Sequence, residues 1–482
     1  MEKQITAHVE KNKQAIIQRF ARLIKIPSIT GEEGEAQAFV SKQYEQMHLE
    51  VDVWEPDVEE LFKKYPQVAQ YPSHWKHDLI LPYNNLPTYE DLMKSDLADV
   101  LNYRGRPNVV GIWRGSGGGK SLILNNHIDV VPVEPMEKWM HDPFGAEIVD
   151  GLMYGRGTSD DKGGVAAAME AVRCLLDLGA RLKGDVILES VVNEEHAGNG
   201  TLACIARGYH ADAVIAGEPS ANKIRLGAYG GTYWGIKLAG RALHTKERWD
   251  GDELKGVSAI EKLAGVINHL LKLETEQNKT PVDEFFSGKK PFNLNIGRVW
   301  GGTYDTTSAE SCTLRGSIYF GPDVGPVQKV MDLLKESVQK AASEDPWLQK
   351  HRPEVEFFHH DDAHRMSPDA EIVKTVGRAG EKILGHKPQI IPGVGANDCR
   401  HHVNQSKIPS LVFGPGTGDK AHAIDESISI DNFISNIKAL ALAIYQWCEG
   451  SRDLSDRINP HKGGDAIVSD KLFRLNPSKK EQ

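Results

Sequence analysis

The stretch GRGTSDDKGG, residues 155–164, joins a short apolar run to a segment whose apolar residues have helical spacing. A glycine-rich turn before a helix is typical of a phosphate-binding loop, and the dinucleotide pattern GxGxxG begins here as expected. The sixth position of that pattern, however, is Asp160, and Asp161 follows it. Because two carboxylates at the start of a helix would repel a phosphate, the stretch indicates a loop that holds a cation.

Apolar runs before and after this loop predict the strands of a sheet. Four runs have the length of buried strands, and a helix is expected at Gly163–Leu178. Buried strands that alternate with helices predict an α/β fold, a mixed sheet covered by helices. Each run is followed by acidic or histidine side chains: SLILNN (121–126) by His127 and Asp129, DVILESVV (185–192) by Glu194 and Glu195, DAVIAG (212–217) by Glu218, and IPSLVFG (408–414) by His422.

These side chains predict a metal site. Sites in open α/β sheets form beyond the carboxyl ends of the strands, which is where they stand. Carboxylates gathered there without a cation would raise one another's pKa, whereas carboxylate oxygens and imidazole nitrogens suit divalent metals. Each residue alone has a structural alternative: His127 as a packed histidine, Asp160 and Asp161 as a helix cap, and Glu194 and Glu195 as a solvated edge. The combination favours the metal.

The order of elements changes between residues 230 and 361. The patterns there predict strand (YWGIKL), helix, two strands (FNLNIGRV and SCTLRGSIYF), helix and strand (EVEFF), which is a ferredoxin-like βαββαβ unit. A further helix and the fourth buried strand follow, so this unit is predicted as an insertion. The catalytic domain is then made of residues 1–229 and 362–482. Residues 56–106 predict an excursion over the surface, either a packed loop or a wall over the site.

The composition excludes several classes of protein. The 482 residues carry a formal net charge of −10 without a long basic block, which argues against nucleic-acid binding. The polar start MEKQITAHVEKNKQ lacks the apolar region of a signal peptide, and no run is long enough to span a membrane. Five scattered cysteines without CxxC spacing fit a reducing, cytoplasmic setting. The charged tail after Gly450 shows no clear pattern.

Six stretches resemble the M20 metallopeptidase/amidohydrolase family, which includes acetylornithine deacetylase and succinyl-diaminopimelate desuccinylase. They stand in family order between about Gly105 and Gln446. They are NNHIDVVP, WMHDPFGAEIVDGLMYGRGTSDDKGG, NEEHAGNGT, AGEPS, GRALHT and GTGDKAHAIDES.

The resemblance implies a role for each residue. Two divalent metal ions are expected, with zinc as the family expectation and cobalt or manganese as alternatives. The general base is Glu194, acting on a metal-bound water, and His244 on the inserted domain reaches the active site of a partner subunit. The insertion is thus expected to be a lid and to form a homodimer. The implied ligands are His127 and Glu218 for one metal, Glu195 and His422 for the other, and Asp160 as the bridge, with Asp129 orienting His127.

The chain departs from the family where substrates are recognised. Thr306 stands about where relatives have Asn, and Ala309 where they have Pro. Tyr319 stands at the position of an Arg that binds the substrate carboxylate, and Arg298, Arg315 or Arg400 could replace it. A loop that reads Asn397-Asp398 has Thr-Asp in relatives. The candidate substrate residues are therefore Tyr319, Asn397, Asp398 and Arg400.

The sequence thus predicts an enzyme that hydrolyses the amide bond of a small N-acyl compound, a deacylase or deformylase. A substrate without a free carboxylate is an option because of Tyr319. One alternative is a dipeptidase, tripeptidase or carboxypeptidase of the same family. A more distant alternative is a silent binding protein, although silent relatives are expected to lose a ligand or the base, and none is missing here. The predicted partners are a small molecule and a second copy of the chain, with neither nucleic acid nor membrane.

Overall fold

The ends of the buried strands come together in an eight-stranded mixed sheet. The computed structural model describes residues 1–75, 81–282, 284–286, 288–393 and 395–449. The strand order is β1-β2-β6-β3-β7-β18-β8-β17, and β3 runs parallel to both β6 and β7, as does β18 to β7. The strands are β1 (Glu50–Trp54), β2 (Asn108–Trp113), β3 (Leu122–His127), β6 (Val186–Val191), β7 (Ala213–Ala216), β8 (Ile224–Arg225), β17 (Ile390–Ile391) and β18 (Ser410–Val412).

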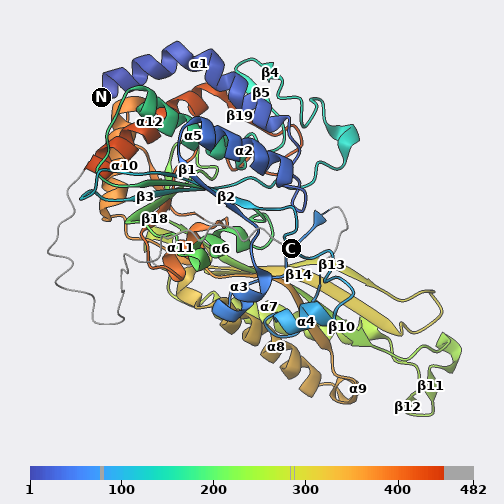
Figure 1. Cartoon of the computed structure of the whole chain (residues 1–482). Helices are drawn as coiled ribbons and strands as arrows, with labels where there is room; N and C mark the ends of the chain where they lie inside the picture. Colours follow the sequence, from blue (N-terminus) through green and yellow to red (C-terminus); the bar gives the residue numbers. More distant parts are fainter. Residues whose placement is uncertain (76–80, 283, 287, 394, 450–482) are drawn as a thin grey trace, which may run out of the picture.

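Helices cover both faces of this sheet, as the fold prediction required (Figure 1). The four central strands are buried along their whole length, which explains why they read as continuous apolar runs. On one face lie α1 (Glu2–Ile24), α2 (Gly34–Gln46), α5 (Lys162–Asp177), α10 (Glu371–Leu384) and α12 (Ile430–Glu449), and on the other α6 (Asn199–Arg207) and α11 (Cys399–Asn404).

A second, four-stranded sheet occupies the lower part of Figure 1. Its order is β13-β14-β10-β15, with every neighbouring pair antiparallel, and α7 and α8 pack on it. This is the ferredoxin-like βαββαβ arrangement that the sequence predicts. Along the chain it consists of β10 (Gly230–Ala239), α7 (Ala259–Gln277), β13 (Phe292–Gly301), β14 (Ser311–Phe320), α8 (Val327–Ser343), α9 (Pro346–Lys350) and β15 (Glu354–Asp361). We refer to residues 230–361 as the second-sheet unit.

Short elements complete the described chain. They are α3 (Val58–Lys64), α4 (Tyr89–Lys94), the sheet of β4 (Ile148–Val149), β5 (Leu152–Tyr154) and β19 (Ser427–Ser429), the pairs β9 (Gly227–Ala228) with β16 (His364–Arg365) and β11 (Trp249–Asp250) with β12 (Glu253–Leu254), and the 3-10 helices η2 (Met136–Lys138), η3 (Thr245–Glu247), η4 (Glu284–Phe286) and η5 (Pro322–Val324). None of the helices described is long and apolar enough to cross a membrane. The predicted tail after Gly450 lies outside the described residues.

The described part of residues 56–106 is packed against neighbouring elements, as in the packed-loop alternative, rather than simply running over the surface. Phe62, Tyr71 and Tyr83 are buried in the same apolar core as the second-sheet unit. The backbone of Tyr83 exchanges two hydrogen bonds with Phe357 of β15. The segment therefore fills the junction between the two sheets. Its lack of periodicity reflects irregular backbone that is satisfied by neighbouring elements rather than exposure to water.

Candidate active site

The predicted ligands meet at the carboxyl edge of the large sheet. His127 is the last residue of β3, Glu194 and Glu195 follow β6, and Glu218 follows β7. Register pairs His127 with Val191 across the parallel strands β3 and β6, so the residues that come next emerge side by side. Asp160 joins them from the glycine-rich loop before α5.

Two half-sites share Asp160. The Nε2 atom of His127 lies 3.1 Å from Asp160 Oδ1 and 3.5 Å from Glu218 Oε1. The Nε2 atom of His422 lies 2.9 Å from Glu195 Oε2 and 3.5 Å from Asp160 Oδ2. The two oxygens of Asp160 thus face different histidines, as a carboxylate that bridges two ions would.

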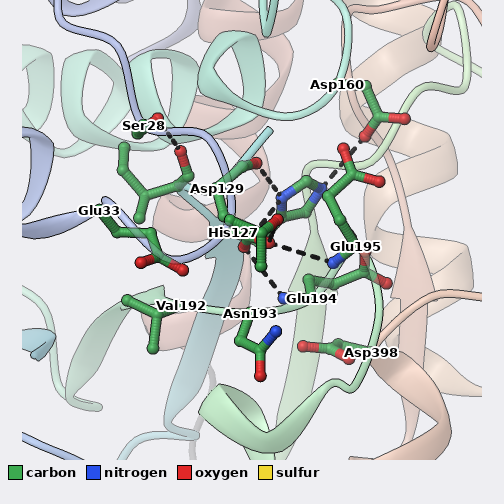
Figure 2. A network of polar contacts seen from close by, with 12 residues as sticks. Ser28, Glu33, His127, Asp129, Asp160, Val192, Asn193, Glu194, Glu195 and Asp398 are labelled. Carbon is green, nitrogen blue, oxygen red and sulfur yellow. Dashed lines mark hydrogen bonds and ion pairs between the residues drawn. The ribbon is translucent and has the colours of Figure 1, made fainter. Parts of the chain in front are cut away.

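Asp129 fixes the neighbouring candidate site residues through hydrogen bonds, as Figure 2 shows. Its carboxylate accepts hydrogen bonds from the backbone N–H groups of Glu194 (2.9 Å) and Glu195 (3.2 Å) and from the Thr30 hydroxyl (2.8 Å). Its backbone carbonyl accepts a hydrogen bond from His127 Nδ1 at 2.9 Å. Nε2 is therefore the nitrogen of His127 that faces Asp160, and in a neutral ring it is the one left free to bind a metal.

A kink after β6 comes directly before the two adjacent glutamates. Asn193 has a φ of 64°, a left-handed conformation that asparagine tolerates better than most residues. Two residues of the 56–106 segment hold its side chain: the Tyr103 hydroxyl donates to Asn193 Oδ1 at 2.6 Å, and Asn193 Nδ2 donates to Ser73 Oγ at 2.6 Å. Residues 56–106, to which the sequence analysis assigned no definite role, therefore support the turn that carries Glu194 and Glu195.

The charge state of the carboxylates fits a cation site. Burial, followed by the neighbouring Glu218, raises the pKa of Glu194 well above its ordinary value. Burial, followed by Asp160, raises the pKa of Glu218 to about 8. Burial also opposes ionisation of Asp160, but His127 outweighs it and lowers that pKa. Divalent cations would replace the protons that such crowded carboxylates otherwise keep.

Two groups of side chains bring their ligand atoms within 4.8 Å of one another: His127, Asp160 and Glu195, and His127, Glu194 and Glu218. Carboxylate oxygens with imidazole nitrogens are a donor set that zinc, cobalt and manganese accept. The residues present therefore fit a metal centre. Glu194, a member of the second group, has Oε2 3.9 Å from His127 Nε2 and Oε1 3.8 Å from Arg400 Nη1.

The site opens into a cavity of about 750 Å³ between the two sheets. Its floor includes Asp160, Glu194, Glu195, Glu218 and His422, and Arg225 and Arg400 also line it. The second-sheet unit contributes Tyr233, Tyr319, His359 and Asp361 to its wall.

The candidate substrate residues divide into two pairs. Tyr319 and Arg400 line the cavity, and Arg400 Nη2 is ion-paired with Asp361 at 3.1 Å. Asn397 and Asp398 are buried behind the wall: Asn397 accepts a hydrogen bond from the Cys399 backbone, and Asp398 accepts one from the Thr201 hydroxyl at 2.6 Å. Of the other two arginines considered, Arg298 lies over Trp300 and Arg315 over Phe358, and neither is among the lining residues.

His244 is not in the cavity of its own chain. It is exposed, begins the short helix η3, and forms an isolated bridge with Thr307 on the second-sheet unit. Thr306, one of the departures from the family pattern, lies beside it and accepts a hydrogen bond from the Thr245 backbone.

Several contributors to the site were not predicted. Glu426 fixes the glycine-rich loop, because its carboxylate accepts from the backbone N–H groups of Ser159 (2.8 Å) and Asp160 (3.0 Å) and from Arg156 (2.7 Å). Glu426 lies four residues after His422 in the stretch GTGDKAHAIDES, which resembles the M20 family. This position could have marked Glu426 as part of the site. His359 and Asp361 gave no such signal, because they sit in a strand that reads as ordinary polar alternation.

The comparisons with known proteins agree with this geometry. The profile described as peptidase family M20/M25/M40 matches residues 123–446. An N-formyl-4-amino-5-aminomethyl-2-methylpyrimidine deformylase of Bacillus subtilis (strain 168) is 31% identical over 370 residues, which are 73% of this chain and 85% of the relative. The protein with that name from Halalkalibacterium halodurans is 28% identical over 471 residues, 92% of this chain and 97% of the relative.

Solved structures share the fold. The di-peptidase Dug1p from Saccharomyces cerevisiae matches with a TM-score of 0.70 at 17% identity, over 93% of this chain and 99% of that one. A Bacillus subtilis protein described as a dinuclear metal binding peptidase from the M20 family matches with a TM-score of 0.58 at 15% identity, over 91% and 99% of the two chains.

Proposed function

The chain belongs to the peptidase family M20/M25/M40, and from this premise we propose that it is a metal-dependent deformylase, which hydrolyses the formamide of a small compound that carries an aromatic ring. The family and the similar curated proteins make it an amidohydrolase. One observation carries the choice of substrate. Among the described lining residues, the second-sheet unit brings two tyrosines, one histidine and one aspartate to the cavity, which favours a planar, uncharged ring over a carboxylate. The cations that line the cavity, Lys223, Arg225 and Arg400, lie outside this unit, and Arg400 is already paired with Asp361.

We assign the metal ligands as His127 and Glu218 at one position, His422 and Glu195 at the other, and Asp160 between them. Two divalent cations bound there would polarise the amide carbonyl and lower the pKa of water. Zinc is the expected metal.

Glu194 serves as the general base. It takes a proton from the attacking water and delivers it to the departing amine, two steps that one carboxylate can perform in turn. Its placement supports this role, because its side chain is only 10% exposed and Arg400 lies 3.8 Å from one of its oxygens. The Asp129 carboxylate fixes the backbone of Glu194 and thereby the direction of its side chain.

A second copy of the chain completes the site in this proposal. The second-sheet unit would act as lid and dimerisation surface, and its His244 would donate a hydrogen bond to the developing oxyanion in the partner's cavity. In support, β13 is an edge strand of its sheet, and Val299, Trp300 and Tyr304 near its end are exposed by 58%, 46% and 71%. Exposed apolar side chains in a group mark interaction surfaces.

The cysteines support a reducing compartment. All five are buried and unpaired. Burial raises the pKa of Cys399 and Cys448, which keeps them as unreactive thiols. We therefore propose that the enzyme works in the cytoplasm.

An amine-release screen tests the proposal. The protein, reconstituted with zinc, is offered N-formyl-4-amino-5-aminomethyl-2-methylpyrimidine, N-formylbenzylamine, N-formyl and N-acetyl amino acids, and dipeptides. We expect the highest kcat/KM with the formylated aminopyrimidine and little turnover of substrates that carry a free carboxylate. Preferential turnover of dipeptides would instead support the peptidase alternative, and preferential turnover of N-acyl amino acids would mean that Arg225 or Arg400 binds a carboxylate.

A further inference from the structure

One wall of the cavity is lined by aromatic rings from three strands and a loop. We call His196, Tyr233, Tyr319 and His359 the tyrosine–histidine pocket. His359 on β15 lies 4.8 Å from the Tyr233 ring on β10, with the planes inclined by 30°, and 5.4 Å from His196. The hydroxyl groups of Tyr233 and Tyr319 are 3.0 Å apart. The rings thus form a continuous aromatic surface beside the catalytic centre.

This surface contains buried polar atoms without partners. His196 and His359 are only 8% and 7% exposed. Both ring nitrogens of His196, and Nδ1 of His359, have no hydrogen-bond partner among the residues described. An unsatisfied buried polar atom is energetically unfavourable, so groups of this kind in a cavity wall indicate a ligand that satisfies them.

The hydrogen-bonding role of His359 is fixed by the residue behind it. Nε2 of His359 donates to the Asp361 carboxylate at 2.6 Å, so in the neutral ring Nδ1 is the nitrogen left to accept a hydrogen bond. The His359 side chain lines the cavity. Asp361 is itself held by Arg400 at 3.1 Å and by the Gln70 amide at 3.3 Å. Arg400 is thus engaged by a carboxylate of the protein, which makes it a poor receptor for a carboxylate of the substrate.

We propose that the tyrosine–histidine pocket binds the amine half of the substrate, a planar, uncharged heteroaromatic ring that carries an N–H donor. The inference rests on the proposed deformylase function and names the residues that select its substrate. The ring stacks against Tyr233 and His359, and an exocyclic amino group donates to His359 Nδ1. His359 is the specificity residue, and Asp361, which fixes its tautomer, is a positioning residue.

A substitution that keeps the ring but removes the acceptor tests the proposal. His359→Phe is compared with His351→Phe, the same change at an exposed histidine of the second-sheet unit that lies outside the cavity. The substrates are N-formyl-4-amino-5-aminomethyl-2-methylpyrimidine and its analogue with hydrogen in place of the 4-amino group. We expect the wild type and His351→Phe to favour the amino substrate, and His359→Phe to lose this preference by on the order of 10-fold, mainly through KM. His359→Gln, whose amide can both donate and accept, should keep part of it.

A binding measurement with the free amine tests the pocket independently of the proposed deformylase reaction. Calorimetry with 4-amino-5-aminomethyl-2-methylpyrimidine needs no turnover. Weaker binding to His359→Phe but not to His351→Phe supports the pocket even if no formamide is hydrolysed, in which case the proposed function alone fails. Equal binding to all three proteins, or an unchanged preference between the two substrates in His359→Phe, overturns the pocket and leaves the deformylase proposal standing.

Discussion

At the scale of single residues, the site is a set of side chains whose directions are fixed by other side chains. Asp129 is not among the described residues that line the cavity, yet its carboxylate accepts hydrogen bonds from the backbone N–H groups of both Glu194 and Glu195, and its carbonyl accepts one from His127 Nδ1. The turn that carries the adjacent glutamates is fixed by the left-handed conformation of Asn193 and by the two hydrogen bonds to Asp129.

Replacing Glu194 by Gln tests the general base. The amide has nearly the same shape but cannot accept a proton from water, so we expect kcat to fall by about 10²–10⁴-fold. Metal content, measured by plasma emission, should be unchanged. Glu147→Gln, a change at an exposed glutamate, is the control. A variant that loses metal would place Glu194 among the ligands, together with His127 and Glu218.

Replacing Asp129 by Asn tests the support of the site. One acceptor oxygen becomes an N–H₂ group that faces the backbone N–H of Glu194 or Glu195, which loosens the turn. We expect metal affinity, measured by competition with a chelator, to fall about 10- to 100-fold. A metal affinity equal to that of the wild type would show that the turn keeps its conformation without the Asp129 carboxylate.

The meeting of the candidate ligands at one edge of the sheet could be predicted from the sequence, whereas much of their support could not. His127, Glu195 and Glu218 stand directly after apolar strands, and strand ends meet at one edge of a sheet. Glu426 and His359 act through contacts between residues far apart in the chain, which no local pattern records. Glu426, for example, reaches back 266 positions to the backbone of Asp160.

At the scale of elements, strand β15 is joined to the catalytic unit by a buried ion pair. Asp361 lies at its end, and the pair with Arg400 is 3.1 Å long. Burial opposes ionisation of Asp361, but Arg400 and then His359 outweigh it, so the pKa of Asp361 is held well below its ordinary value of 3.8. The native state therefore binds this proton less readily than the unfolded chain does.

The sign of the pH effect follows from this shift. A carboxyl whose pKa is depressed in the native state stabilises the protein fully above its unfolded pKa and loses that contribution as the pH falls below it. Asp361→Asn should lower the free energy of unfolding of the metal-free protein by on the order of 3 kcal/mol at pH 7. The difference from the wild type should shrink as the pH drops from about 5 toward 3, in urea titrations followed by circular dichroism. A difference that is constant over this range would contradict the assignment.

The predictability of the elements depended on their periodicity. The buried strands of the large sheet and the βαββαβ order of the second were recognisable because they repeat apolar residues in regular ways. Residues 56–106 have no such repeat, although Tyr83 pairs with β15 and Tyr103 and Ser73 hold Asn193. Irregular segments that are fixed by tertiary contacts look like exposed loops in a sequence.

At the scale of the whole molecule, the proposed role of His244 requires a second copy of the chain, because His244 is not among the described residues that line the cavity of its own chain. Mixing two inactive variants tests this. A site that takes Glu194 from one subunit and His244 from the other is intact only in a mixed dimer of His244→Ala and Glu194→Gln. We expect each variant alone to be strongly impaired and the refolded mixture to recover up to about a quarter of wild-type activity.

This figure follows from counting sites: half of the dimers in a random mixture are mixed, and one of the two sites in each is complete. No recovery in dimers shown by mass spectrometry to be mixed would mean that His244 acts within its own chain or not at all.

The central claim is that the strand ends of the large sheet form a dinuclear metal centre around Asp160. The most direct measurement is the number of metal ions per chain, by plasma emission, in the wild type and in Asp160→Ala after identical reconstitution with zinc and removal of free metal. We predict about two metal ions per chain in the wild type and fewer than one in Asp160→Ala. We also predict that only the wild type hydrolyses the amide. A wild-type protein that binds no metal and hydrolyses no amide after reconstitution would contradict the account.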